Sequence, residues 1–236
     1  MKKIEQIACK KCSAINPLYT SICENCGAFV RERVVNIDLF NTIGQLIEDT
    51  QSAFKQILFA ENKNFIIFIT IFLAIKNLIL ARFFSVPELG IKGVSISFIL
   101  SYLIILAFTF VIFGTFTFVQ KIIYKNLKIE IRFKDIYSLN IYSFIPLIIS
   151  LFFIFPVELV VLGGDIFSNN PNPFEIKPTV AYFLSGFEII LFVWSIVLLT
   201  KSIIFITGKY LLSILLANLF LISLILLYFL SSKIIF

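Results

Sequence analysis

Four cysteines near the amino terminus carry the strongest chemical signal in this chain. They form two Cys-x-x-Cys pairs with ten residues between the pairs, and they are all the cysteines in the sequence: Cys9, Cys12, Cys23 and Cys26. Each pair can present two sulfur atoms to one ion, and four thiolates suit the tetrahedral coordination of Zn²⁺. The spacing therefore predicts a closed, structural metal site with Zn²⁺ as its cofactor.

The segment around these cysteines has the character of a small zinc ribbon, which we place at residues 1–34. Ser13 and Gly27 each follow the second cysteine of a pair, where a small residue permits a tight turn. Three apolar residues are expected to pack around the metal: Ile22, Phe29 and Val30. Because metal-binding thiols persist in reducing surroundings, we expect this domain to lie in the cytosol.

The remainder of the chain is dominated by apolar residues. Of 236 residues, 59% are hydrophobic and only 14% are charged, which is outside the range of water-soluble domains. A helix crosses the roughly 30 Å of membrane hydrocarbon with about 20 residues. Five segments are long enough: 65–84, 94–119, 141–162, 180–199 and 210–230. We therefore expect an all-α polytopic membrane protein with a five-span membrane domain at residues 64–236.

Residues 35–63 are expected to form an amphipathic helix and a linker between the ribbon and the first span. Apolar residues recur at helical spacing from Ile37 to Phe59, with a break expected near Gly44. The pattern favours a helix lying flat at the cytosolic lipid interface. The alternative is a linker helix that packs on the zinc ribbon.

Charges in the connections between the spans predict the orientation, because Lys and Arg near span ends stay on the cytosolic side. The connection after the third span holds Asp165 and Glu175 against a single Lys177. Basic residues follow the second and fourth spans: Lys121, Lys125, Lys128, Arg132, Lys134, Lys201 and Lys209. We expect a multi-pass protein of the cell membrane, in contact with its lipids, with the amino terminus in the cytosol and the carboxyl terminus outside.

Four polar residues inside the predicted spans are the other candidate functional residues. Lys76 and Asn77 lie near the middle of the first span, where a lysine costs about 2.5 to 3.5 kcal/mol. Glu188 in the fourth span is the most economical partner for Lys76, and Glu158 lies near the outer end of the third. The pair would be a structural link between helices or part of an ion or proton pathway. Alternatively, Lys76 extends to the outer surface beside Arg82.

Histidine is absent from the sequence. This absence excludes acid/base catalysis by histidine, Ser-His and Cys-His nucleophile pairs and His-ligated metals. No other catalytic arrangement is evident, so we expect a protein that is not an enzyme.

Two resemblances to known families follow from these residues. The two cysteine pairs, with Asn16-Pro17 between them and Gly27 after them, are similar to the short zinc ribbon at the amino terminus of many prokaryotic membrane proteins. Ser13 stands where that pattern has glycine. All four ligand positions match, and the resemblance implies a zinc site without indicating its purpose.

From about Asp49 to its end, the chain resembles the Yip family, whose founding members interact with Ypt/Rab-type GTPases in eukaryotic vesicle traffic. The matching features are Phe54 before the first span, five spans, the segment 139–146 that opens the third span with Pro146, and Trp194 in the fourth. The resemblance implies a membrane scaffold or adaptor that engages cytosolic partners or shapes the bilayer. It does not carry over a Rab partner, because a zinc ribbon replaces the region that meets GTPases.

The leading hypothesis is a non-enzymatic membrane scaffold or adaptor whose zinc ribbon presents a recognition surface to a cytosolic protein. Residues 1–35 hold six Lys and Arg against three Glu, a net charge of +3, which favours anionic headgroups or acidic partners. A nucleic-acid partner is disfavoured, since only Tyr19 and Phe29 offer stacking surfaces. Whether the chain forms homo-oligomers stays open.

The alternative hypothesis is a transporter or channel subunit that uses Lys76 and Glu188, with Asn77 and Glu158 nearby and the ribbon as a regulatory cap. A zinc sensor is the third hypothesis. It is disfavoured because four thiolates in a closed site bind zinc tightly and exchange it slowly.

Overall fold

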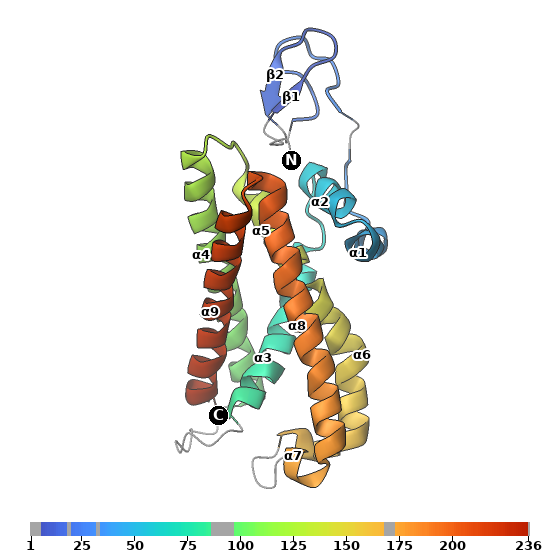
Figure 1. The fold of residues 1–236 in the computed structure, drawn as a ribbon, viewed down its shortest axis with the longest axis vertical. Helices are drawn as coiled ribbons and strands as arrows, with labels where there is room; N and C mark the ends of the chain where they lie inside the picture. The colour runs from blue at the N-terminus through green and yellow to red at the C-terminus, as the bar shows by residue number, and fades with distance from the viewer. Residues whose placement is uncertain (1–5, 18–19, 32–33, 86–96, 168–172, 236) are drawn as a thin grey trace. The chain divides into compact units, whose positions relative to one another are not determined.

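The computed structural model describes the chain except for residues 1–5, 18–19, 32–33, 86–96, 168–172 and 236 (Figure 1). The described residues are mostly helical and divide into two compact units. The first unit comprises Met1–Ile67, Phe113–Ser143 and Leu198–Ala217. The second comprises Phe68–Ile112, Phe144–Val197 and Asn218–Phe236.

Four helical stretches in the described part of the chain are long and apolar enough to cross a membrane, which confirms an integral, multi-pass membrane protein. They are Ile99–Asn126, Phe133–Leu162, Pro178–Thr207 and Tyr210–Ser231. The predicted first span corresponds to α3 (Ile66–Ser85), whose stretch Ile66–Ala81 is apolar but shorter than the other four. The count of five spans therefore stays a prediction.

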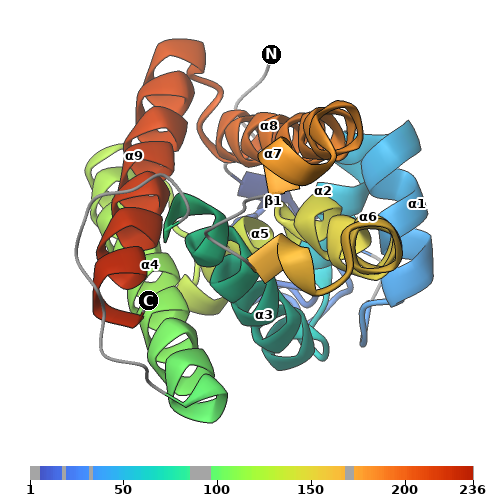
Figure 2. The same cartoon turned by 90° about the horizontal axis from the view of Figure 1, so that it is seen from below.

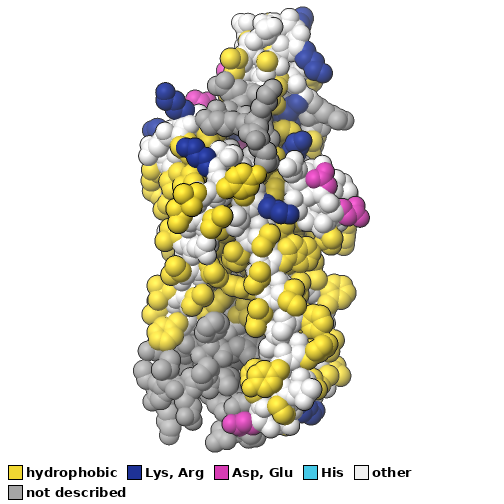
Figure 3. All heavy atoms as spheres, viewed as in Figure 1, with side chains coloured by type: hydrophobic (Ala, Val, Ile, Leu, Met, Phe, Trp, Pro, Cys, Tyr) yellow, Lys and Arg dark blue, Asp and Glu magenta, His cyan; other side chains and the backbone are white. Residues whose placement is uncertain are grey.

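The long helices extend beyond the predicted spans. Helix α4 covers Phe98–Asn126, α8 covers Pro178–Thr207 and α9 covers Tyr210–Ile235. The predicted third span is built from α5 (Phe133–Tyr142) and α6 (Ile145–Leu162), with Pro146 in the first turn of α6, where a missing amide costs no helix bond. Figure 3 shows hydrophobic side chains over much of the surface of these helices, as lipid contact requires.

The ribbon in the first unit is a hairpin followed by a second turn. Strands β1 (Gln6–Ala8) and β2 (Ile15–Pro17) pair antiparallel, with Ala8 opposite Ile15. Both cysteine turns repeat the same backbone hydrogen bonds: the amides of Cys9 and Cys23 donate to Ala14 and Ala28, at 2.9 and 2.8 Å, and the amides of Ser13 and Gly27 donate to Cys9 and Cys23, at 2.9 and 3.0 Å. The two cysteine pairs therefore have one local geometry.

Ser13 and Gly27 end the two cysteine turns with positive φ angles of 57° and 67°. Glycine adopts this conformation at no steric cost, whereas a residue with a Cβ is strained there. The small residues predicted to permit tight turns do so, and Ser13 is the less suitable of the two.

The predicted amphipathic segment is two helices, α1 (Leu39–Glu48) and α2 (Thr50–Phe59), and the predicted break near Gly44 is wrong. The break lies at Asp49, whose carboxylate accepts hydrogen bonds from the amides of Gln51 and Ser52 at the start of α2. Asp38 caps α1 in the same way through the amide of Asn41. A capping carboxylate satisfies amides that have no partner within their helix. Helix α1 therefore ends before Asp49, and α2 begins after it.

Helix α2 packs on α5 within the first unit. Its buried face consists of Ala53, Phe54, Ile57 and Leu58. Helix α1 buries Thr42 and Leu46 and leaves Phe40 and Ile47 on the surface.

The second unit contains α6, the 3₁₀ helix η1 (Gly163–Phe167), the short helix α7 (Pro173–Ile176) and the first part of α8. Figure 2 looks nearly along the axis of α6. Leu162, Ile166 and Leu184 form an apolar cluster that ties η1 to α6 and α8. Inside this unit, three helices carry charged residues: Lys76 lies on α3, Glu158 on α6 and Glu188 on α8.

Candidate metal centre and buried charge clusters

The four cysteine sulfur atoms converge on one point, and all lie within 4.8 Å of one another. The Sγ atoms of Cys9 and Cys26 are 3.6 Å apart, as are those of Cys12 and Cys23. These distances are too long for a disulfide, whose sulfur atoms are about 2.05 Å apart. They are close to the roughly 3.8 Å that separates two sulfurs bound to one tetrahedral Zn²⁺ at about 2.3 Å each. The predicted clustering of the four thiols is confirmed.

Backbone amides and one buried side chain support the sulfur atoms. The amide of Lys11 donates to Cys9 Sγ at 3.4 Å, and Asn16 Nδ2 donates to Cys23 Sγ at 3.5 Å. Asn16 is buried, and its Oδ1 accepts a hydrogen bond of 3.1 Å from the amide of Glu24. The sequence pattern marks Asn16 only as a residue between the cysteine pairs, whereas in the structure it holds the second pair against the hairpin.

The electrostatics of the four thiols fit a divalent cation. Amide hydrogen bonds, chiefly from Cys26, lower the pKa of Cys23 to about 6. Amides of Lys11 and Cys12 lower the pKa of Cys9. The amide of Ala28 favours the thiolate of Cys26, but the three other thiols and burial outweigh it and raise its pKa to about 12. Four thiolates therefore form together only when a positive ion compensates their charge, as Zn²⁺ would.

The apolar packing around the cysteines differs from the prediction in part. Val30 is buried with Cys9 and Cys23, and Ile7, Ala14 and Ala28 pack against them. Ile22 and Phe29 are exposed, so the expectation that they pack around the metal is wrong. Their backbones form an isolated antiparallel bridge, which places the two side chains opposite each other.

Lys76 and Glu188 form a buried ion pair in the second unit, which confirms the predicted pairing. Lys76 Nζ lies 2.7 Å from Glu188 Oε1, and Lys76 is completely buried. Ser150 Oγ on α6 donates to the same carboxylate oxygen. The pairing removes the need for Lys76 to extend to the outer surface. The side chain of Arg82, the other reference point of that alternative, lies outside the described residues.

Asn77, the neighbour of Lys76, joins three helices of the second unit. Its Nδ2 donates to Thr109 Oγ1 on α4 at 3.1 Å, and Tyr228 on α9 donates its hydroxyl to Asn77 Oδ1 at 2.9 Å. All three residues are buried. The predicted polar positions of α3 are therefore both used for contacts between helices.

Glu158, the fourth of the predicted polar residues, has a buried carboxylate oxygen without a hydrogen-bond donor among the described residues. It is 2% exposed, and its Oε2 is buried with no donor. Its charge interacts with those of Glu188 and Lys76, and we therefore group it with them. Lys76, Ser150, Glu158 and Glu188 are called the α3/α6/α8 cluster below.

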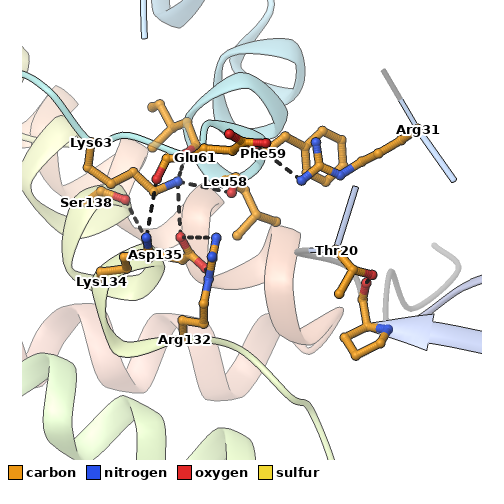
Figure 4. A network of polar contacts seen from close by, with 12 residues as sticks. Thr20, Arg31, Leu58, Phe59, Glu61, Lys63, Arg132, Lys134, Asp135 and Ser138 are labelled. Atoms are coloured by element: carbon orange, nitrogen blue, oxygen red, sulfur yellow. Dashed lines mark hydrogen bonds and ion pairs between the residues drawn. The ribbon is translucent and has the colours of Figure 1, made fainter. Parts of the chain in front are cut away.

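A second group of charges, in the first unit, was not predicted (Figure 4). Asp135 is completely buried and accepts two hydrogen bonds from Arg132, at 2.7 and 3.2 Å. Lys63 Nζ lies 3.1 Å from Asp135 and donates to the carbonyls of Ile57 and Leu58 at the end of α2. These contacts fasten the end of α2 to the start of α5.

Burial lowers the pKa of Lys63 to about 8, although Asp135 opposes this shift. The sequence indicates Arg132 only as one of the basic residues between two spans. Asp135 is an acidic residue within this basic connection, and that contrast was the sequence feature that could have indicated an ion pair.

Comparison with known proteins finds no relative: no family model, no curated protein and no solved structure matches the chain. The resemblance to the Yip family therefore rests on the order and spacing of residues in this sequence alone.

Proposed function

We propose that this chain is a non-enzymatic membrane adaptor of the Yip type, in which a zinc ribbon presents a recognition surface to a cytosolic protein. The observation that carries the proposal is the exposure of Ile22 and Phe29, which we call the ribbon face. Phe29 is 68% exposed, although the ribbon has an apolar cluster in which it could have been buried. Exposed aromatic and aliphatic side chains held by a rigid frame are typical of binding surfaces.

Zinc is the metal that best suits the ribbon, because its four sulfur ligands complete a tetrahedral site. Cys9, Cys12, Cys23 and Cys26 would hold the ion, which supplies a cross-link between the two cysteine turns. A site with four protein ligands has no open position for a substrate. The metal would instead make the ribbon rigid, which reduces the conformational entropy lost when the ribbon face binds a partner.

The helices between the ribbon and the membrane support a position at the lipid interface. On α1, the exposed residues Phe40 and Ile47 share one face, and Phe40 is 85% exposed. An apolar face that is not covered by protein is suited to the boundary between headgroups and acyl chains. In the proposed topology, the amino terminus is cytosolic, α3 completes five spans, and the carboxyl terminus is outside, as the charge distribution favours.

Crosslinking in native membranes, followed by mass spectrometry, tests the adaptor function. The chain is compared with Phe29→Ser, which alters the ribbon face, and with Lys10→Gln, which changes an exposed residue elsewhere on the ribbon. Zinc content is measured in each variant to show that the ribbon is intact. We expect a cytosolic protein to crosslink to the unchanged chain and to Lys10→Gln, and to be lost from Phe29→Ser. The same cytosolic proteins in all three samples would contradict the proposal.

A transporter or channel subunit is the second candidate, favoured by the α3/α6/α8 cluster. Buried charges between membrane helices commonly mark pathways for ions or protons. Flux of ions and small metabolites into vesicles containing the purified chain tests this function, with Glu188→Gln as the comparison. Flux that depends on Glu188 would support it, and equal permeability of protein-containing and empty vesicles would reject it.

A further inference from the structure

The charges of the α3/α6/α8 cluster do not balance. Among the residues that the structure describes, it contains one cation, Lys76, and two carboxylates, Glu158 and Glu188, and all three side chains are buried. Ser150, the fourth member, is neutral. The ion pair of Lys76 with Glu188 uses the one positive charge, so an ionised Glu158 leaves a net charge of −1. A buried charge without a partner is strongly disfavoured and is removed by binding a counter-charge.

The hydrogen bonds show where a counter-charge would sit. Lys76 and Ser150 both donate to Glu188 Oε1, whereas Glu188 Oε2 has no donor among the described residues. Glu158 Oε2 is also buried without a donor. Each carboxylate therefore keeps one buried oxygen unused, and buried carboxylate oxygens are normally satisfied.

Asn77, the polar neighbour of Lys76, is neutral and already hydrogen-bonded. Asn77 on α3 bonds Thr109 on α4 and Tyr228 on α9. Glu188 and Lys76 are the charges with which Glu158 interacts. Among the described residues, the charges that act on Glu158 are thus one carboxylate and one ammonium that is itself paired.

The chemistry of the cluster favours a proton over a metal cation. An alkali ion needs several oxygen ligands, but Ser150 already donates to Glu188, and the Lys76 ammonium would repel a second cation beside the same carboxylate. A proton requires one oxygen and converts Glu158 into a neutral acid. Two buried carboxyl groups whose charges interact do not readily ionise together, so one of them tends to keep a proton.

We propose that Glu158 and Glu188 together bind one exchangeable proton beside Lys76. The proton comes from water and sits on a carboxyl oxygen, mainly that of Glu158, so that the cluster of one ammonium, one carboxylate and one carboxylic acid is neutral. This inference does not depend on the adaptor function, because the charge must be balanced whichever partner the ribbon binds.

Infrared spectroscopy of the full chain in lipid bilayers tests the proposal, because a protonated carboxyl group has a C=O band that shifts in D₂O. At pH 7 in sodium-free buffer we expect one such group per chain. Glu158→Gln should remove the band, and Glu175→Gln, at an exposed position on α7, should leave it unchanged. Lys76→Met leaves two carboxylates without a cation, so it should double the band.

Three results would overturn the proposal. The first is absence of the band from the unchanged chain, and the second is its persistence in Glu158→Gln. The third is a band that disappears on adding Na⁺ or K⁺ at constant pH, since this would assign the site to an alkali ion. Loss of expression of Lys76→Met does not affect these readouts, because the pair of Glu158→Gln and Glu175→Gln decides the assignment.

Discussion

Lys76 and Glu188 form a 2.7 Å ion pair although 112 residues separate them in the chain. The pair joins α3 to α8, and both partners are buried in the second unit. A buried ion pair adds little to the folding free energy relative to two apolar residues at the same positions. Removing one partner, however, leaves the other as an unpaired buried charge. Its main effect is therefore to make the correct arrangement of these helices much more favourable than arrangements that separate the charges.

Glu188→Gln should destabilise the protein by about 3 kcal/mol, because Lys76 loses its acceptor and remains buried. This is the lower end of the usual range, since Glu158 can release its proton and supply the missing negative charge. Thermal unfolding in a mild detergent measures the loss, with Glu175→Gln as the matched control. Equal stability of the two variants would contradict the importance of the pair.

Cys23→Ser should remove the metal and unfold the ribbon while the membrane helices persist. Three remaining thiols cannot complete the tetrahedral site, and a segment this small has too little apolar packing to fold alone. Zinc content should fall from one per chain to nearly none, and protease should cleave before residue 35 without degrading the rest. Chelation of zinc from the unchanged chain should produce the same cleavage pattern, and resistance of the chelated ribbon would show that it folds without metal.

Opposite changes at Ser13 and Gly27 should have opposite effects on the ribbon. Ser13→Gly relieves a positive φ angle and should stabilise the ribbon by about 1 kcal/mol, whereas Gly27→Ala introduces the same strain and should destabilise it by about 1 kcal/mol. Among the described residues, none beyond the chain neighbours of Gly27 has an atom within 4 Å of a Cβ added there, so a clash does not complicate the comparison. The chelator concentration that removes half of the zinc should rise in the first variant and fall in the second.

Asn16→Ala should weaken zinc binding by roughly 10- to 100-fold, the effect usual for residues that hydrogen-bond to metal ligands. The variant loses the hydrogen bond to Cys23 Sγ and leaves the amide of Glu24 without its acceptor. Competition with a zinc-binding dye measures the affinity. Glu24→Gln changes an exposed side chain next to Cys23 and should retain normal affinity; an equal loss in both variants would assign the effect to general disturbance of the turn.

The free energy of unfolding should increase as the pH rises from about 8 to 10.5, because of the titration of Lys63. Its pKa falls from the ordinary 10.5 to about 8 on folding, mainly through burial, so the unfolded chain binds more protons in this interval. Stability therefore increases with pH there, by on the order of 1 kcal/mol per unit. The difference in unfolding free energy between the unchanged chain and Lys63→Met isolates this contribution. A difference that stays constant from pH 8 to 10.5 would contradict it.

Features set by local spacing were predictable from the sequence. The four cysteines and the small residues after them act within a few positions of each other, so their pattern indicated both the metal site and its turns. Lys76 was also informative, because its cost inside a membrane span demanded a partner and Glu188 was the deepest acid available. The apolar length of the spans indicated membrane crossing, but helices continue beyond the hydrocarbon and their ends could not be placed.

Features that depend on three-dimensional packing were not predictable. Ile22 and Phe29 are apolar, and only the fold of the ribbon shows that Val30 fills its centre instead. Gly44 is the weaker helix former, yet the break occurs at Asp49, where a side chain caps the next helix. Asp135 and Lys63 meet because α2 packs on α5, and nothing in the sequence indicates that Lys63 is the partner of Asp135.

The hydrogen bond between Asn77 and Tyr228 has a consequence for biosynthesis. The two residues are 151 positions apart. At about 5 to 20 residues per second, a ribosome needs on the order of 10 s to produce Tyr228 after Asn77. During this interval α3 has left the ribosome without the partner that its amide later bonds. We infer that Asn77 bonds Thr109 first and gains its contact with Tyr228 only when α9 is made, so this hydrogen bond is among the last polar contacts of the second unit to form.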